Sequence, residues 1–172
     1  MPDTWHRNHT TVGHSYTANT VFPRQGGQTP HIDYPYWTVD EKFGLSLIQQ
    51  PLAIVYIALI TDFTVDNGAT SLRPNSHKDP KYPTNQTEFF ENAMQVEGRA
   101  GDILVIRSSV QHCAMPNLSA QTRSGVIIHM GPTFIRPYEN IPAGLHQSIK
   151  DRASPEMRKV TGLDNPFPRL KK

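Results

Sequence analysis

The sequence has little of what several classes of protein require. Its 172 residues include one cysteine, Cys113, so no disulfide can form within the chain, and we expect a reducing compartment. The longest apolar run, Leu52 to Ile60, is far too short to cross a bilayer. The first residues, MPDTWHRNHTT, contain no apolar stretch typical of a signal peptide. We therefore expect a cytoplasmic protein that binds no membrane.

Charge is also scarce. Charged residues make up 19% of the chain and the formal net charge is only +2, which argues against a dedicated nucleic-acid-binding protein. The low charge fraction and the regular apolar runs argue against a disordered chain. The length suits a single domain that buries a hydrophobic core.

Proline and glycine, by contrast, are frequent and dispersed. The 15 prolines and 11 glycines separate many short segments, and this pattern favours an all-β sandwich or barrel. The strongest strand is predicted for residues 52–60, which are almost wholly apolar and rich in β-branched side chains, so it should be central in a sheet. Further strands are predicted at residues 15–22, 69–73, 94–97, 103–106, 110–115 and 125–134.

The ends of the chain differ from this series of strands. Residues 1–14 are predicted to form a polar arm, 15–141 the β core, and 142–172 a C-terminal extension with short helices. Ser154 followed by Pro155 predicts a helix start, and Gly162 predicts its end. Residues 74–87 are polar and rich in proline, which predicts a long surface loop.

A histidine and an aspartate two residues apart, His31 and Asp33, are candidate metal ligands. In a strand, residues i and i+2 project to the same face, so this imidazole and carboxylate could bind one metal ion together. A third ligand must come from elsewhere. Two histidines and one carboxylate on one face of an octahedron are diagnostic of non-haem Fe(II) oxygenases. Taken alone, the motif is also compatible with a polar pair beside a turn.

Among the eight histidines, His112 is the best candidate for the third ligand. Arg123 follows His112 by eleven residues and lies at the start of the next apolar strand. The planar guanidinium of an arginine suits bidentate binding of a carboxylate, so an anion-binding group could lie near the metal. His112 alone is also compatible with a hydrogen-bonded core histidine, and Arg123 alone with an exposed ion pair.

Four sequence blocks in series resemble the phytanoyl-CoA dioxygenase family of Fe(II)- and 2-oxoglutarate-dependent oxygenases. The blocks are HIDYPYW, DFTVDNGATSLRPNSHK, GRAGDILVI and HCAMPNLSAQTR, and the resemblance covers roughly residues 15–135. It implies a double-stranded β-helix, also called a jelly roll. It further implies that His31, Asp33 and His112 bind Fe(II), and that Arg123 forms a salt bridge with the distal carboxylate of 2-oxoglutarate.

The activity implied by the resemblance is hydroxylation of a C–H bond in a small organic substrate. Dioxygen and 2-oxoglutarate would be consumed, and succinate and carbon dioxide released. Asp33 stands where related halogenases have a small residue, which favours hydroxylation. Asn19 shares one strand face with Thr17 and Val21, and by the same resemblance it is expected to contact 2-oxoglutarate. A solvated strand residue is an equally good interpretation of Asn19.

Two features depart from the family pattern. Ala114 stands where members often carry a hydroxyl that helps to hold 2-oxoglutarate, and less sequence precedes the first core strand than is common. These departures favour an alternative function, a non-catalytic metal-binding jelly-roll protein that acts as a binding module or subunit. The short sequence before the first core strand also makes a homodimer more expected than usual. A cupin-like metal isomerase or sugar-binding barrel is a third reading, but it leaves Arg123 unexplained.

Other chemically capable residues receive simpler interpretations. His129, in the apolar stretch GVIIHM, is expected to pack or to face substrate, and only secondarily to bind metal. His77 is expected to brace its loop or line the pocket mouth. Cys113 is predicted to be a small buried residue that faces away from its neighbour. Three aromatic residues are candidates for pocket lining or for core: Tyr34, Tyr36 and Trp37.

Overall fold

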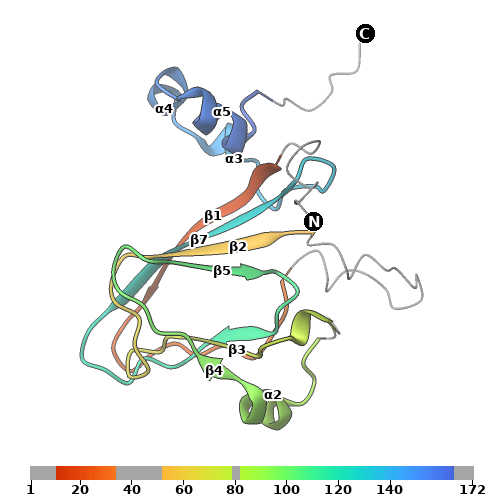
Figure 1. Ribbon diagram of the computed structural model, residues 1–172. Coiled ribbons are helices and arrows are strands. Elements are labelled where there is room, and N and C mark those ends of the chain that lie inside the picture. The colour runs from red at the N-terminus through yellow and green to blue at the C-terminus, as the bar shows by residue number, and fades with distance from the viewer. Residues whose placement is uncertain (1–10, 34–51, 79–81, 165–172) are drawn as a thin grey trace.

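Two antiparallel sheets form the body of the protein. The computed structural model describes residues 11–33, 52–78 and 82–164 (Figure 1). One sheet has the strand order β1-β7-β2-β5 and the other β4-β3-β6, and the two face each other as the walls of a double-stranded β-helix. The predicted all-β jelly roll is therefore confirmed. The strands are β1 (Thr11–Val21), β2 (Ile54–Leu59), β3 (Thr70–Leu72), β4 (Met94–Gln95), β5 (Ile103–Arg107), β6 (His112–Ala114) and β7 (Arg123–Pro132).

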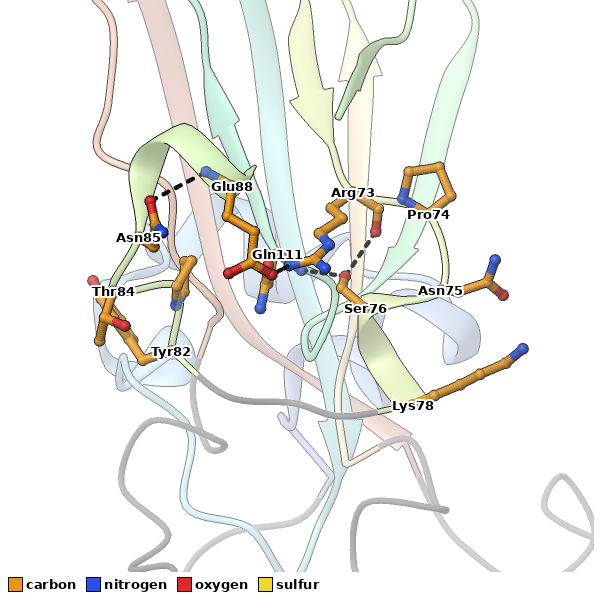
Figure 2. Close-up of a pocket in the computed structure, with 11 residues that line it drawn as sticks. Arg73, Pro74, Asn75, Ser76, Lys78, Tyr82, Thr84, Asn85, Glu88 and Gln111 are labelled. Carbon is orange, nitrogen blue, oxygen red and sulfur yellow. Dashed lines mark hydrogen bonds and ion pairs between the residues drawn. The ribbon is translucent and has the colours of Figure 1, made fainter. Parts of the chain in front are cut away.

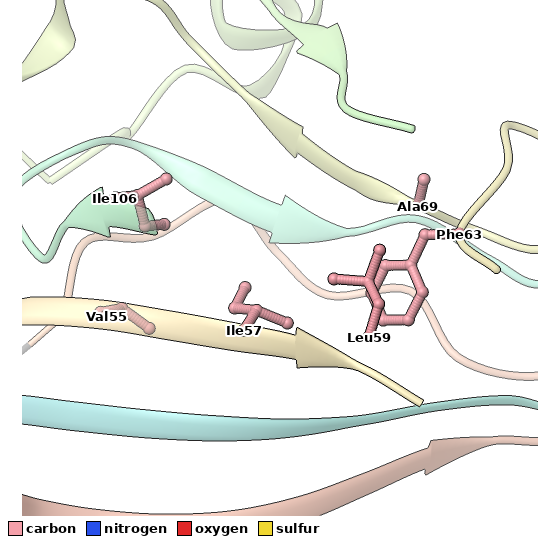
Figure 3. Packing of buried hydrophobic residues seen from close by; sticks show 6 residues of the cluster. All are labelled: Val55, Ile57, Leu59, Phe63, Ala69 and Ile106. Carbon is pink, nitrogen blue, oxygen red and sulfur yellow. The ribbon is translucent and has the colours of Figure 1, made fainter. Parts of the chain in front are cut away.

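Strand β2 is central, as its apolar sequence predicts. It pairs with β5 on one side and with β7 on the other. Alternate residues of β2 point into the barrel, where they pack with side chains from β5 and from the segment after β2 (Figure 3). Burying each of these aliphatic side chains stabilises the fold by roughly 1.5–3 kcal/mol. The buried cluster comprises Val55, Ile57, Leu59, Phe63, Ala69 and Ile106.

Strand β1 begins earlier than the sequence suggests. Thr11 already pairs with Pro132 of β7, so the arm predicted for residues 1–14 is wrong for residues 11–14, and residues 1–10 lie outside the described part of the chain. The pairing shifts between Gly13 and Ser15 at a β-bulge. A Cβ on Gly13 would lie 2.4 Å from the Tyr16 ring, so a larger residue here would require the tyrosine side chain to move.

The loop predicted for residues 74–87 contains more structure than expected. It includes the 3₁₀ turn η4 (Ser76–Lys78), and its end leads into helix α2 (Gln86–Asn92). The Asn85 side chain accepts a hydrogen bond from the backbone N–H of Glu88, which caps the helix. Phe89 of α2 is fully buried. The helix was not predicted because its seven residues are too few to show a clear apolar period.

Three short helices form the C-terminal extension, as predicted. They are α3 (Ile141–Gly144), α4 (Gln147–Asp151) and α5 (Pro155–Thr161), and Figure 1 shows them together at one end of β1. Ser154 caps α5, and Gly162 ends it with a left-handed conformation at φ 76°. The Tyr16 hydroxyl donates to the Val160 carbonyl at 3.5 Å and so links α5 to β1. In the part of the chain described here, no helix has the length and apolar character needed to span a membrane.

Candidate metal centre

The segment that carries His31 and Asp33 lies against β6, which carries His112. The backbones of His31 and His112 exchange two hydrogen bonds of 2.9 Å, and the Asp33 N–H donates to the Ser108 carbonyl at 2.8 Å. Directly paired residues of antiparallel strands project to the same side of the ladder. The two imidazoles therefore lie beside each other, with ring centroids 4.5 Å apart, and Asp33 joins them from two residues further along.

The three side chains are arranged as one donor set. One ligand atom from each of His31, Asp33 and His112 lies within 4.8 Å of the other two. The Nε2 atoms of His31 and His112 lie 3.8 Å and 3.5 Å from the Asp33 carboxylate oxygens. This spacing suits a single ion that bridges them, because metal–nitrogen and metal–oxygen bonds of about 2 Å place adjacent donors roughly 3 Å apart.

Both histidines have fixed ring orientations. The Nδ1 atom of His31 lies 2.9 Å from the Thr29 carbonyl, and that of His112 lies 2.9 Å from the Val110 carbonyl. A carbonyl can only accept, so each Nδ1 carries the proton and each Nε2 presents its lone pair towards the carboxylate. Metal-binding histidines in proteins are held in the same way by a second hydrogen bond.

Electrostatics favour the protonation states that a metal needs. Burial alone would raise the pKa of Asp33, but the contact from His129 and the nearby imidazoles outweigh it and hold that pKa below its usual range. Burial is the main cause that lowers the pKa of His112, against the opposing charge of Asp33. An ionised carboxylate and a neutral imidazole are the forms that bind a divalent cation.

Arg123 lies in the same pocket as the donor set, at the first residue of β7. Its side chain is buried, its guanidinium stacks over the Phe63 ring at 4.6 Å, and its Nη1 donates to the Gly68 carbonyl. Gly68, with φ +82°, ends the Asp66-Asn67-Gly68 turn and places this carbonyl beside the arginine. Burial lowers the pKa of Arg123. A buried guanidinium facing a pocket is a suitable partner for a carboxylate.

The pocket between these groups has a volume of about 290 Å³. One wall is aliphatic and contains Val55, Ile57 and Ile127. The other residues that line it, apart from the donor set and Arg123, include Thr17, Asn19, Gln28, Thr70 and Ala114. Asn19 therefore lines the pocket, which the alternation of β1 alone left open, and its contact with 2-oxoglutarate stays a prediction.

Sequence reasoning missed several polar residues of this pocket. Thr70 lies directly opposite Ala114 in the pairing of β3 with β6, so a hydroxyl sits next to the position where the expected one is absent. Gln28 accepts from the Ala114 N–H through its side-chain carbonyl at 2.9 Å. The alternation of β1 could have identified Thr17, but only the strand register identifies Thr70.

The remaining candidates from the sequence lie partly inside this pocket and partly outside it. His129 lines the pocket, and its Nε2 lies 3.4 Å from Asp33 Oδ2, although it is not part of the three-donor group. Cys113 is fully buried, as predicted. His77 lies in η4 and does not line the metal pocket. The aromatic candidates Tyr34, Tyr36 and Trp37 lie outside the described residues.

A second, polar pocket lies between η4 and α2. Its volume is about 350 Å³, and an ion pair of 2.9 Å joins Arg73 to Glu88 across it (Figure 2). Ser76 braces this region, because its hydroxyl donates to the Arg73 carbonyl and accepts from the Gln111 N–H. Arg73 is thus already paired with a carboxylate. Among the described residues, a metal donor set and a buried arginine line one pocket together, the one between the sheets.

A comparison with protein families explains this combination. The family model for phytanoyl-CoA dioxygenase matches residues 3–125 and thus includes all three donor residues and Arg123. The chain belongs to the phytanoyl-CoA dioxygenase family.

Two fungal members of known sequence are similar to it. Dioxygenase FUM3 of Gibberella moniliformis is 29% identical over 158 residues, which cover 88% of this chain and 50% of that protein. Dioxygenase cdmD of Talaromyces verruculosus is 32% identical over 121 residues, which cover 69% of this chain and 38% of that protein.

Solved structures share the fold at lower identity. AviO1 from Streptomyces viridochromogenes superposes with a TM-score of 0.59 at 19% identity, covering 74% of this chain and 53% of that one. A nickel complex of the non-heme monooxygenase ThoJ gives a TM-score of 0.57 at 20% identity, covering 75% and 47%. The chain thus spans about half, or less, of the length of the relatives and solved structures that it matches.

Proposed function

We propose that this phytanoyl-CoA dioxygenase family member is an Fe(II)- and 2-oxoglutarate-dependent dioxygenase that hydroxylates a small organic substrate. The balanced reaction consumes dioxygen, 2-oxoglutarate and a C–H bond, and yields succinate, carbon dioxide and the corresponding alcohol. One observation carries the proposal: the His31, Asp33 and His112 donor set and the Arg123 guanidinium line a single pocket. Neither half of this arrangement alone would specify a 2-oxo acid as co-substrate.

Each residue has a distinct role in this proposal. His31, Asp33 and His112 would hold the iron, because two histidines and one carboxylate form the donor set typical of non-haem Fe(II) oxygenases. The iron supplies the activation of dioxygen, and the protein supplies positioning and a dry environment. Arg123 binds the distal carboxylate of 2-oxoglutarate. Asn19 and Thr70 are the polar side chains we assign to further contacts with the co-substrate.

The aliphatic wall has a separate role. Val55, Ile57 and Ile127 offer no hydrogen bond to water, so this side of the pocket is hard to hydrate. A pocket that excludes water strengthens the ion pair between Arg123 and a bound carboxylate.

The decisive test is turnover by the purified protein. Iron-loaded protein is mixed with 2-oxoglutarate and oxygen, and succinate formation is measured with and without candidate substrates, since uncoupled turnover needs no substrate. The Arg123→Met variant is the matched control, because it retains the metal ligands and loses the cation. Well-folded, iron-loaded protein that binds no 2-oxoglutarate and forms no succinate would refute the proposal.

Ala114 supports a second candidate, a metal-binding β-helix without turnover that acts as a binding module or subunit. The hydroxyl that family members often carry is missing at this position. Oxygen consumption separates the two functions, because a binding module would take up metal without consuming oxygen. A homodimer also belongs to the proposal, and light scattering on the eluted protein would measure its mass.

A further inference from the structure

His129 is the one pocket histidine that the donor set does not use. It lies on β7, and β7 pairs with β1 so that His129 is directly opposite Ser15. The imidazole is mostly buried and stands between two polar partners. Its Nε2 is 3.4 Å from Asp33 Oδ2, and its Nδ1 is 2.9 Å from the Ser15 hydroxyl. The Tyr138 ring lies against it, with centroids 5.2 Å apart.

The two partners together select one arrangement of protons. The Nε2 of His129 faces a carboxylate oxygen, which accepts hydrogen bonds, so this contact needs a ring proton on Nε2. In the tautomer with its proton on Nε2, Nδ1 is an acceptor, and the Ser15 hydroxyl donates to it. A serine hydroxyl rotates freely to meet this requirement. The contact from Ser15 to His129 and the contact from His129 to Asp33 therefore require the same tautomer of His129.

A carboxylate that binds a metal through one oxygen leaves its other oxygen in need of a donor. Three imidazoles contact the Asp33 carboxylate, and two of them belong to the donor set. If His31 and His112 bind a metal through Nε2, His129 is the imidazole that can still donate to the Asp33 carboxylate. Partners of this kind orient metal ligands in many sites, and replacing them typically weakens metal affinity about 10- to 100-fold.

We propose that His129 is a positioning residue that holds the Asp33 carboxylate in its metal-binding orientation, and that Ser15 acts through His129 by fixing its tautomer. The inference rests on the proposed function, because it assumes that Asp33 is a metal ligand. His129 need not touch the metal, the co-substrate or the substrate in this role. Its position on a strand of the larger sheet gives the carboxylate a rigid support.

The test measures Co²⁺ binding by calorimetry and by visible absorption, since Co²⁺ is stable in air and its spectrum reports ligand geometry. His129→Leu removes the donor at similar volume, whereas His129→Gln retains an N–H that can reach Asp33. Ser15→Ala removes the outer partner. His146→Leu is the matched control, because His146 is exposed and caps α4 away from the pocket.

We expect His129→Leu to weaken Co²⁺ binding about 10- to 100-fold and to alter the absorption spectrum. His129→Gln should recover most of the affinity, and Ser15→Ala should lose about three- to tenfold. Ser15→Ala should have no added effect in the His129→Leu background, because it acts through the histidine. His146→Leu should bind as the wild type does. Circular dichroism of each metal-free variant checks that the fold is retained.

Three results would overturn the inference. Affinity and spectrum in His129→Leu could equal those of the wild type, His129→Gln could be as weak as His129→Leu, or the effects of Ser15→Ala and His129→Leu could simply add. If His129→Leu does not fold, the His129→Gln and Ser15→Ala comparison decides alone, and unchanged Co²⁺ binding in Ser15→Ala then counts against the proposal. Wild-type protein that binds no Co²⁺ would instead refute the proposed function, so the two failures are distinguishable.

Discussion

Replacing Arg123 with methionine should separate its role in ligand binding from its role in folding. Methionine approximates the length of the arginine stem and can still pack on Phe63, but it carries neither charge nor hydrogen-bond donors. Nη1 of Arg123 already donates to the Gly68 carbonyl and Phe63 covers one face of the guanidinium. The remaining donors are therefore the ones available to a carboxylate in the pocket.

The expected loss of affinity follows from burial. Removing one partner of a buried, hydrogen-bonded ion pair costs about 3–5 kcal/mol. At about 1.4 kcal/mol for each factor of ten, this corresponds to a loss of roughly 100- to 4,000-fold in 2-oxoglutarate affinity. Arg123→Lys retains the charge without the planar fork and should lose about tenfold. Metal affinity should change little, because Arg123 does not belong to the donor set.

Folding stability should fall as well, for a different reason. The Gly68 carbonyl loses its donor, which costs about 1–3 kcal/mol, and the cation–π contact with Phe63 contributes about 0.5–2 kcal/mol. We therefore expect Arg123→Met to lower the free energy of unfolding by about 1.5–5 kcal/mol. Urea denaturation of the metal-free protein without 2-oxoglutarate measures this effect by itself.

The assay for the ligand role compares two 2-oxo acids on metal-loaded protein. Calorimetry is performed with 2-oxoglutarate and with 2-oxopentanoate, which has a methyl group in place of the distal carboxylate. Wild-type protein should strongly prefer 2-oxoglutarate, and Arg123→Met should bind both acids weakly and about equally. If the variant keeps the wild-type preference, Arg123 is not the carboxylate partner and our reasoning about the pocket is wrong.

Three further predictions concern the metal, the thiol and the response to acid. Asp33→Ala should reduce metal affinity more than 100-fold and leave the circular dichroism spectrum unchanged; metal affinity equal to wild type by calorimetry would contradict it. Burial raises the pKa of the Cys113 thiol to about 11, so a thiol reagent at pH 7.5 should react with denatured protein far faster than with native protein, and comparable rates would contradict the buried position. Burial lowers the pKa of the His14 imidazole in the folded protein. As pH falls through about 6.5, His14 is therefore protonated in the unfolded state before it is protonated in the folded state. The contribution of His14 to stability is thus fully present above pH 6.5 and is lost as pH falls from there to the folded pKa. Between pH 7.5 and 5, the melting temperature should therefore fall less steeply for His14→Leu than for the wild type. Parallel curves of melting temperature against pH would show that His14 does not contribute.

Local sequence signals predicted much of the fold correctly. The apolar run around β2 requires a central strand, because such a surface must be covered by neighbours wherever the strand lies. The cap and stop of α5 depend only on residues within two turns, so Ser154 and Gly162 were sufficient to predict them. Helix α2 has one buried anchor, Phe89, in a short segment, and this signal is too weak to detect from sequence.

The candidate site was also predictable from sequence only in part. Amino-acid sequence alone determined that His31 and Asp33 share a face, because the two-residue repeat of an extended chain does not depend on the partner strand. Only the tertiary structure decided that His112 lies beside His31, that Thr70 lies opposite Ala114, and that His129 contacts Asp33. These contacts depend on how segments far apart in the sequence pair, and a register shift of one residue would turn a side chain to the other face of its sheet.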